Sequence, residues 1–276
     1  MNRIKSASLS LLLTAFLAAT AFADGWRLGF GVHDFYVPDM ESHTYGIGGG
    51  ISYEKTTDSG FHWFGSYDLF KDFDKDELDP DHIPIWWKLH IRVDRPMLEI
   101  SPQSYLSWEV AHNSKTNTVS SIEREIKIFP AILYNWENER FKFSLKAAAG
   151  YFFLEIDDDV PKSRGYARGD FRSDGFAYSF AANGTVNLGQ SFQLFGQFQR
   201  WADEDTWLEN QYLIELRYDA DHWFSDSELV LGIEGNHYNL LPYTPSYAIM
   251  PVSFVYLPIL PWDDDVMVRL SFTTKW

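Results

Sequence analysis

Ionisable side chains recur at every second position in several stretches of this chain, with apolar side chains between them. Between residues 85 and 94, Lys88 and Arg92 fall on one side of such an alternation, and the other side is apolar. Charges gathered on one face can neutralise one another in pairs, or they can line a narrow aqueous passage for small solutes. Both signs are mixed, so no preference for anions or cations is indicated. The candidates for this face are Lys88, Arg92, Glu109, Lys127, Lys146, Glu215, Arg217 and Arg269.

Three short aspartate clusters are a second candidate for chemistry, because carboxylate oxygens attract calcium. Asp72, Asp74 and Asp76 have the 1-3-5 spacing of an EF-hand loop, but Glu77 stands where the glycine belongs and Ile83 where the bidentate glutamate belongs. We therefore expect solvated loops and no metal site, with loose bridging by divalent cations to phosphate groups as the alternative. The other clusters are Asp157–Asp159 and Asp263–Asp265.

The alternation itself predicts β-strands, since successive side chains of a strand point to opposite faces. Long polar loops and short turns alternate through the first two thirds of the chain. On nearly every strand one face carries Trp, Leu, Ile and Val, and the other carries the charges. This inside-out polarity favours an antiparallel up-and-down transmembrane β-barrel with lipid outside over a soluble β-sandwich.

The strand count is predicted less directly. We count thirteen alternating segments, whereas a bacterial barrel with both ends in the periplasm needs an even number of strands. We predict about twelve strands, with fourteen as the alternative. The discrepancy falls after Gly175: either a strand is hidden near Asp219–Glu228, or Tyr247–Leu257 is not a full crossing.

The last eleven residues, Val266–Trp276, form a strand with one oily and one polar side that ends on an aromatic residue. This ending resembles the C-terminal signature of Gram-negative outer-membrane β-barrels, in which the last strand closes the barrel and carries the insertion signal. The resemblance implies that Leu270, Phe272 and Trp276 form the signal for the barrel-assembly machinery, and that the protein resides in the cell outer membrane.

The first 23 residues have the physical parts of a secretory signal peptide. Arg3 and Lys5 are basic, Ala7–Ala19 is an apolar run too short to span a bilayer, and Ala21–Ala23 fits the small-x-small cleavage rule. The expected division is a signal peptide over residues 1–23 and an outer-membrane barrel over residues 24–276.

The composition restricts the kinds of partner and cofactor that this chain can bind. The formal net charge is −16, which argues against binding to nucleic acid and to anionic membrane surfaces. The chain has no cysteine, so it cannot form disulfides. Aromatic residues make up 17% of the chain, which fits girdles at the two membrane interfaces. No nucleotide-binding loop, zinc spacing or nucleophile elbow is present, and we expect no cofactor.

In overall plan the chain resembles the small solitary autotransporter-like barrels and other 12-strand outer-membrane proteins. That resemblance bears on class and location more than on activity. We expect a non-enzymatic barrel without a passenger domain, either a narrow porin-like channel for small solutes or a structural, surface-exposed barrel. Its expected surroundings are outer-membrane lipid and lipopolysaccharide.

One motif suggests an enzyme instead. His112 and Ser114 resemble the catalytic motif of two outer-membrane lipid hydrolases, the phospholipase A of the outer membrane and the lipid A 3-O-deacylase. The resemblance implies that the serine is the nucleophile and the histidine its base. Both residues share the parity of Val110, the lipid-facing side. Lys115 stands where those families have asparagine, and Glu125 has the opposite parity. A lipid-facing serine hydrolase is therefore the alternative to the non-enzymatic barrel.

Overall fold

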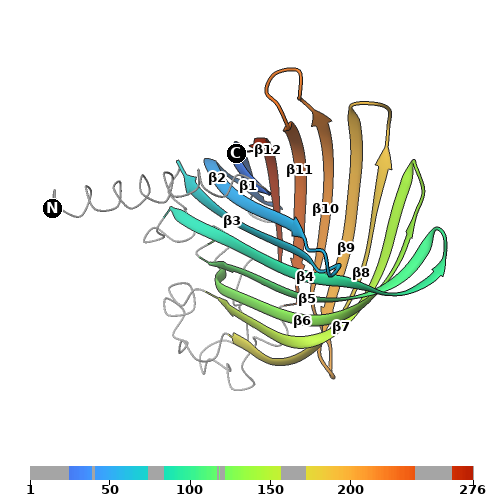
Figure 1. The fold of residues 1–276 in the computed structure, drawn as a ribbon. Coiled ribbons are helices and arrows are strands. Elements are labelled where there is room, and N and C mark those ends of the chain that lie inside the picture. Colours follow the sequence, from blue (N-terminus) through green and yellow to red (C-terminus); the bar gives the residue numbers. More distant parts are fainter. Residues whose placement is uncertain are drawn as a thin grey trace, which may run out of the picture.

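A computed structural model describes residues 25–38, 41–73, 84–116, 118, 122–156, 172–239 and 263–275. Within these ranges twelve antiparallel strands form one closed barrel (Figure 1). The same ranges contain no helix that is long and apolar enough to cross a membrane. The strands are β1 (Trp26–Val37), β2 (Ser42–Thr56), β3 (His62–Asp72), β4 (Ile85–Ser101), β5 (Ser104–Thr116), β6 (Ile122–Glu137), β7 (Phe141–Ile156), β8 (Arg172–Asn187), β9 (Phe192–Ala202), β10 (Trp207–Asp219), β11 (Ser227–Tyr238) and β12 (Asp264–Lys275).

The barrel closes where the first strand meets the last. β1 pairs with β12 from Arg27 opposite Lys275 to Tyr36 opposite Val266. β12 in turn pairs directly with β11, so the ring has no position for a further strand between them. The prediction of twelve strands is confirmed. The extra segment counted at 247–257 lies outside the described residues, and 219–228 spans the turn from β10 to β11.

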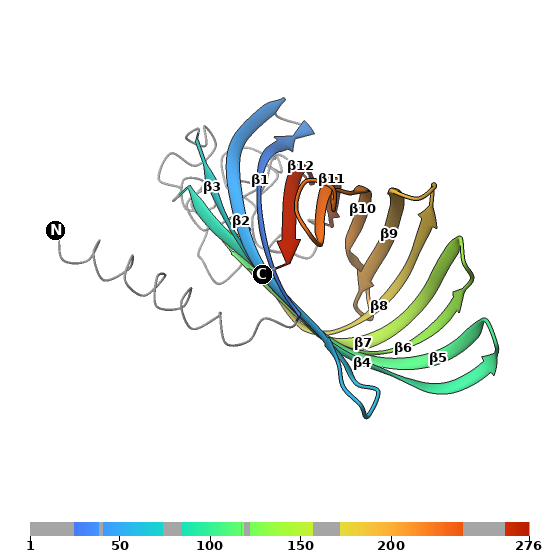
Figure 2. The ribbon, with the colours of Figure 1, turned by 45° about the horizontal axis from the view of Figure 1, so that its top comes forward.

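The two ends of the barrel differ in how the strands are joined. Short turns connect β2–β3, β4–β5, β6–β7, β8–β9 and β10–β11 at the end where β1 begins and β12 finishes, which we call the turn end. Figure 2 shows the hairpins β4–β5, β6–β7 and β8–β9 side by side there. In the β6–β7 turn, the side-chain oxygen of Asn138 accepts hydrogen bonds from the backbone N–H groups of Arg140 and Phe141 at 2.9 and 2.8 Å. An Asx turn of this kind explains why the chain reverses so tightly. We call the opposite end the loop end.

The outer wall is apolar because the strand register aligns the oily positions of neighbouring strands. One row of cross-strand partners runs around five strands and is made only of aliphatic side chains. Their exposed fractions lie between 36% and 54%, far above those of an ordinary core. A continuous oily exterior of this kind is matched to lipid hydrocarbon. The row is Val32, Leu270, Leu231, Leu216 and Leu194.

The inner wall differs from expectation in the loop-end half of the barrel. There the inward positions are largely aromatic, where the sequence favoured ionisable groups. Phe70 and Trp86 stack with ring centroids 4.0 Å apart and an interplanar angle of 14°. Asp72 accepts a hydrogen bond from Trp86 Nε1 at 3.2 Å and lies 2.8 Å from His33 Nε2. We call this group the aromatic layer: Phe35, Phe70, Trp86, Phe152, Trp201 and Tyr238, all at most 4% exposed.

The aromatic layer has a simple physical origin. Large rings that point toward the axis of a narrow barrel meet one another and fill it. Glycines in β2 make this possible: Gly48 is the cross-strand partner of Phe70, and a β-carbon at Gly48 would lie 2.9 Å from that ring. The high aromatic content therefore serves the interior as well as the outer wall.

Candidate functional site: the barrel lumen

Between the aromatic layer and the turn end the barrel encloses a polar cavity of about 560 Å³. Charged and amide side chains line this cavity because they alternate along each strand with the residues that face lipid. All eight residues that the sequence assigned to the charged face line this cavity: Lys88, Arg92, Glu109, Lys127, Lys146, Glu215, Arg217 and Arg269.

Every lysine and arginine that lines the cavity lies within 4.0 Å of a carboxylate. On the walls, Arg92 lies 3.2 Å from Asp94. Lys146 lies 3.3 Å from the Glu109 carboxylate on another strand. The remaining wall pairs are Arg217–Glu215 at 2.5 Å and Arg269–Asp68 at 3.9 Å. Because each charge has a partner of opposite sign close by, the lumen as a whole exerts little net field on a passing ion.

Two further contacts cross the lumen. Lys88 Nζ on β4 lies 2.7 Å from Glu234 Oε2 on β11. Lys115 Nζ donates to Tyr238 Oη at 2.8 Å, and their strands β5 and β11 stand opposite each other in the ring. Side chains that bridge opposite walls occupy the space through which a solute would pass, so these contacts constrict the lumen.

The constriction continues into a cluster of buried charges directly beside the aromatic layer. Lys127 Nζ lies 2.9 Å from Glu125 and 2.7 Å from Glu209, and Lys115 Nζ lies 3.2 Å from Glu125. Their side chains are at most 8% exposed. Lys127 Nζ also sits 3.9 Å from the centre of the Trp201 ring. Charges withdrawn from water in this way require partners of opposite sign, and here each has one.

Two participants in these contacts were not singled out by the sequence. Tyr238 and Trp201 have aromatic side chains, and their parity assigns them to the inward face but does not show which charged groups they meet. Their role follows from the partner on the far wall, which strand periodicity does not reveal.

The histidine and serine of the hydrolase hypothesis share the outward parity of Val110 on β5, and Ser114 also borders the luminal cavity. His112 Nε2 is 3.2 Å from Ser114 Oγ, within hydrogen-bond distance. Ser114 is only 7% exposed. A third group that could orient the imidazole is missing from the adjacent outward positions, which are apolar on both neighbouring strands. Those partners are Ile91 and Ile128 beside His112, and Leu89 and Ile126 beside Ser114.

The residues of the C-terminal signature are placed only in part. Leu270 faces outward at 43% exposure, and the Phe272 ring lies 5.5 Å from that of Phe30 on β1. Trp276 lies outside the described residues, as do the signal peptide at 1–23 and the aspartates at 74, 76 and 157–159. The role of this strand as an insertion signal stays a prediction.

The polarity of the barrel decides its class. Membranes admit strands only when every backbone group pairs within a closed ring, and lipid requires an apolar outer wall. This ring is closed, its outside is oily and its inside is charged. The protein is an outer-membrane β-barrel.

Comparison with known proteins gives likenesses in fold alone. No protein-family model matches the chain, and no curated protein sequence does. Among solved structures, this outer-membrane barrel is similar to the NanC porin, with a TM-score of 0.48, 12% identity, and 90% of this chain and 100% of that chain covered. It is also similar to the KdgM porin in complex with disordered oligogalacturonate, with a TM-score of 0.47 and 6% identity over 91% of this chain and 99% of that chain. For outer membrane phospholipase A from Escherichia coli the TM-score is 0.46 and the identity 10%, over 90% of this chain and 92% of that chain. The likeness to autotransporter-like barrels stays a prediction.

Proposed function

We propose that this outer-membrane barrel is a non-enzymatic, narrow channel for small solutes. The observation that supports the proposal is the polar cavity of about 560 Å³ in its lumen, lined by charges of both signs. A barrel that served only as a scaffold could fill this space with apolar side chains, as it does in the aromatic layer. Charged groups along the lumen instead keep it compatible with water and polar solutes.

In this structure the lumen of the proposed channel is closed by side chains. The contacts Lys88–Glu234, Lys115–Tyr238 and Lys127–Glu209 join strands that are not neighbours in the ring, and the aromatic layer, which includes Tyr238, adjoins them. Conduction requires that some of these side chains move aside. Lys88 and Glu234 are the most accessible of the pairs, at 22% and 17% exposure, and therefore the ones that water can separate most easily.

Single-channel conductance of the refolded chain in a planar bilayer tests the proposal. We expect small, discrete current steps in wild type and larger steps when the lumen is widened by Trp86→Ala. If both proteins fold, as judged by heat-modifiable migration on a gel, and both remain silent, the barrel is structural and the channel proposal is wrong.

A second candidate, a lipid-facing serine hydrolase, is favoured by one observation. The 3.2 Å contact between His112 Nε2 and Ser114 Oγ is the geometry that lets a histidine take the proton of a serine hydroxyl. Release of fatty acid from phospholipid or lipid A in mixed micelles, measured for wild type and Ser114→Ala, tests it. Release that the substitution abolishes would replace the channel proposal, and absence of release from folded wild type would remove the hydrolase.

We further propose outer-membrane lipid and lipopolysaccharide as the surroundings of the apolar wall, and the barrel-assembly machinery as the partner of the β12 strand. The oily row through Val32 and Leu270 supports the first. The alternating β12 strand, which closes the ring, supports the second.

A further inference from the structure

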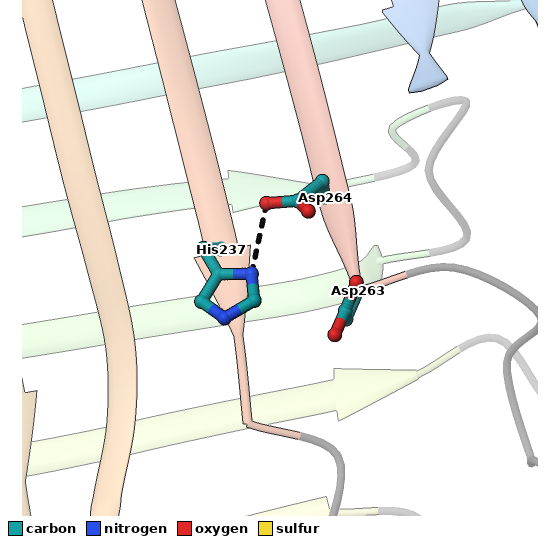
Figure 3. A group of neighbouring side chains, drawn as sticks. All are labelled: His237, Asp263 and Asp264. Carbon is teal, nitrogen blue, oxygen red and sulfur yellow. Dashed lines mark hydrogen bonds and ion pairs between the residues drawn. The ribbon is translucent and has the colours of Figure 1, made fainter. Parts of the chain in front are cut away.

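A potential metal-binding group lies on the outer side of the barrel at the loop end of β11 and β12. His237, Asp263 and Asp264 bring one ring nitrogen and two carboxylate oxygens within 4.8 Å of one another (Figure 3). His237 and Asp264 are direct cross-strand partners. His237 shares the parity of Leu231 and Ile233, which face outward. The group is thus separate from the lumen.

The backbone and the neighbouring rings hold these residues in place. The Tyr238 N–H donates to the Asp263 carbonyl at 2.8 Å, which fixes the start of β12 against the end of β11. On the inner side, Asn236 Nδ2 donates to Asp265 at 2.6 Å. The Trp207 indole stacks on the His237 imidazole, with centroids 4.9 Å apart and 16° between the planes. Ligands that are oriented before an ion arrives lose little entropy when they bind it.

A fourth polar group beside the cluster lacks a partner. Asn210 on β10 is the cross-strand neighbour of His237 and is only 8% exposed. Its side-chain oxygen, Oδ1, has no hydrogen-bond partner among the described residues. A buried amide oxygen without a partner carries a desolvation cost, and amide oxygens are common ligands of metal ions.

We propose that His237, Asp263 and Asp264 bind a divalent transition-metal ion, next to the unpartnered side-chain oxygen of Asn210 on the neighbouring strand. Calcium and magnesium prefer sites made only of oxygen, whereas imidazole together with carboxylates suits ions such as zinc. His237 Nδ1 and Asp264 Oδ1 are now 2.8 Å apart and share a proton in a hydrogen bond. When the ion binds, the imidazole takes the tautomer that carries its proton on Nε2, so that Nδ1 and the carboxylate oxygen can both donate lone pairs to the metal.

Geometry supports an ion that keeps bound water. The side chains of His237 and Asp264 are 34% and 44% exposed, so the open side of the cluster faces solvent or headgroups. Three protein ligands leave at least one coordination position for water in a tetrahedral ion. The site does not depend on the channel proposal, because no residue of the cluster lines the cavity.

The chain supplies a matched control at the same end of the barrel. His43 Nδ1 lies 2.9 Å from Asp34, and its ring stacks on Tyr36 at 4.3 Å. This pair has the same chemistry and a similar aromatic neighbour, but it does not belong to a group of three ligands in the described part of the chain. A His–Asp pair alone should bind an ion far more weakly than three converging ligands.

Calorimetric titration of the refolded, chelator-treated protein with zinc tests the proposal, with calcium and magnesium as separate titrants. We expect one zinc ion per chain, at least tenfold weaker binding in His237→Ala and in Asp264→Asn, and no change in His43→Ala. Cobalt should give a visible absorption band that His237→Ala removes. Heat-modifiable migration establishes that each variant is folded. Zinc binding equal in all variants, tighter binding of calcium than of zinc, or no zinc binding by folded wild type would overturn the proposal.

Discussion

Lys127 on β6 and Glu209 on β10 meet across the lumen with 2.7 Å between Nζ and Oε2, although 82 residues separate them in the chain. Their side chains are 2% and 0% exposed. Neither charge could be buried there alone, since an unpaired ion in a low-dielectric interior loses its hydration without compensation. The contact therefore ties two walls of the barrel together and closes the lumen at the same place.

Removing one member of this pair should destabilise the barrel. Lys127→Met leaves Glu209 without its cation, and breaking a buried pair from one side costs about 3–5 kcal/mol. Urea unfolding followed by tryptophan fluorescence measures the loss. The double variant Lys127→Met, Glu209→Met should recover much of it, and Lys142→Met, at an exposed position, should cost little. If Lys127→Met and Lys142→Met were equally stable, the buried pair would have no energetic role.

The aromatic layer should control conductance. Trp86 faces inward and is 0% exposed, whereas the neighbouring Trp87 has the opposite parity and faces outward. Trp86→Ala should raise the single-channel current because it removes the ring that stacks on Phe70. A cost of about 3–5 kcal/mol in stability is expected from the cavity that it leaves. Trp87→Ala is the matched control and should leave the current unchanged; a larger current in both variants would contradict a gate at Trp86.

Ion selectivity should follow the pairing of the lumen charges. In wild type each cation of the lining has a carboxylate within 4.0 Å, so the reversal potential in a salt gradient should be close to zero. Glu234→Gln removes the partner of Lys88 and should shift the reversal potential toward anion selectivity. Glu139→Gln, at an exposed turn, should have no effect. A strongly selective wild-type channel would show that the pairs separate in the open state.

A new charge should cost different amounts of stability at two neighbouring residues of β10. Ile214 is 55% exposed on the outer wall, and Leu213 lines the cavity. Ile214→Arg places a charge in lipid and should cost about 2–4 kcal/mol near the bilayer midplane. Leu213→Arg enters a polar lumen and should cost less. Urea unfolding in lipid vesicles compares the two, and a smaller cost at Ile214 would contradict the assignment of the faces.

The sequence by itself determined which way each side chain of a strand points. Val32, Leu270 and Lys88 were assigned to their faces from period-two alternation alone, because the pleat of a strand is a local property of the backbone. The same reasoning placed His112 and Ser114 on one side of β5, and residues two apart on a strand are close enough for the 3.2 Å contact that is observed. The expected number of twelve strands followed from the alternation together with the even count that a barrel needs.

Only the tertiary structure decided which inward groups meet. Lys88 and Glu234 are 146 residues apart, and their contact exists because the ring closes and the tilted strands bring certain depths of opposite walls together. Periodicity gives the face of a residue but neither its depth nor its partner across the axis. For the same reason the stacking of Phe70 on Trp86 could not be predicted, and the meeting of His237 with Asp264 depended on the register between β11 and β12.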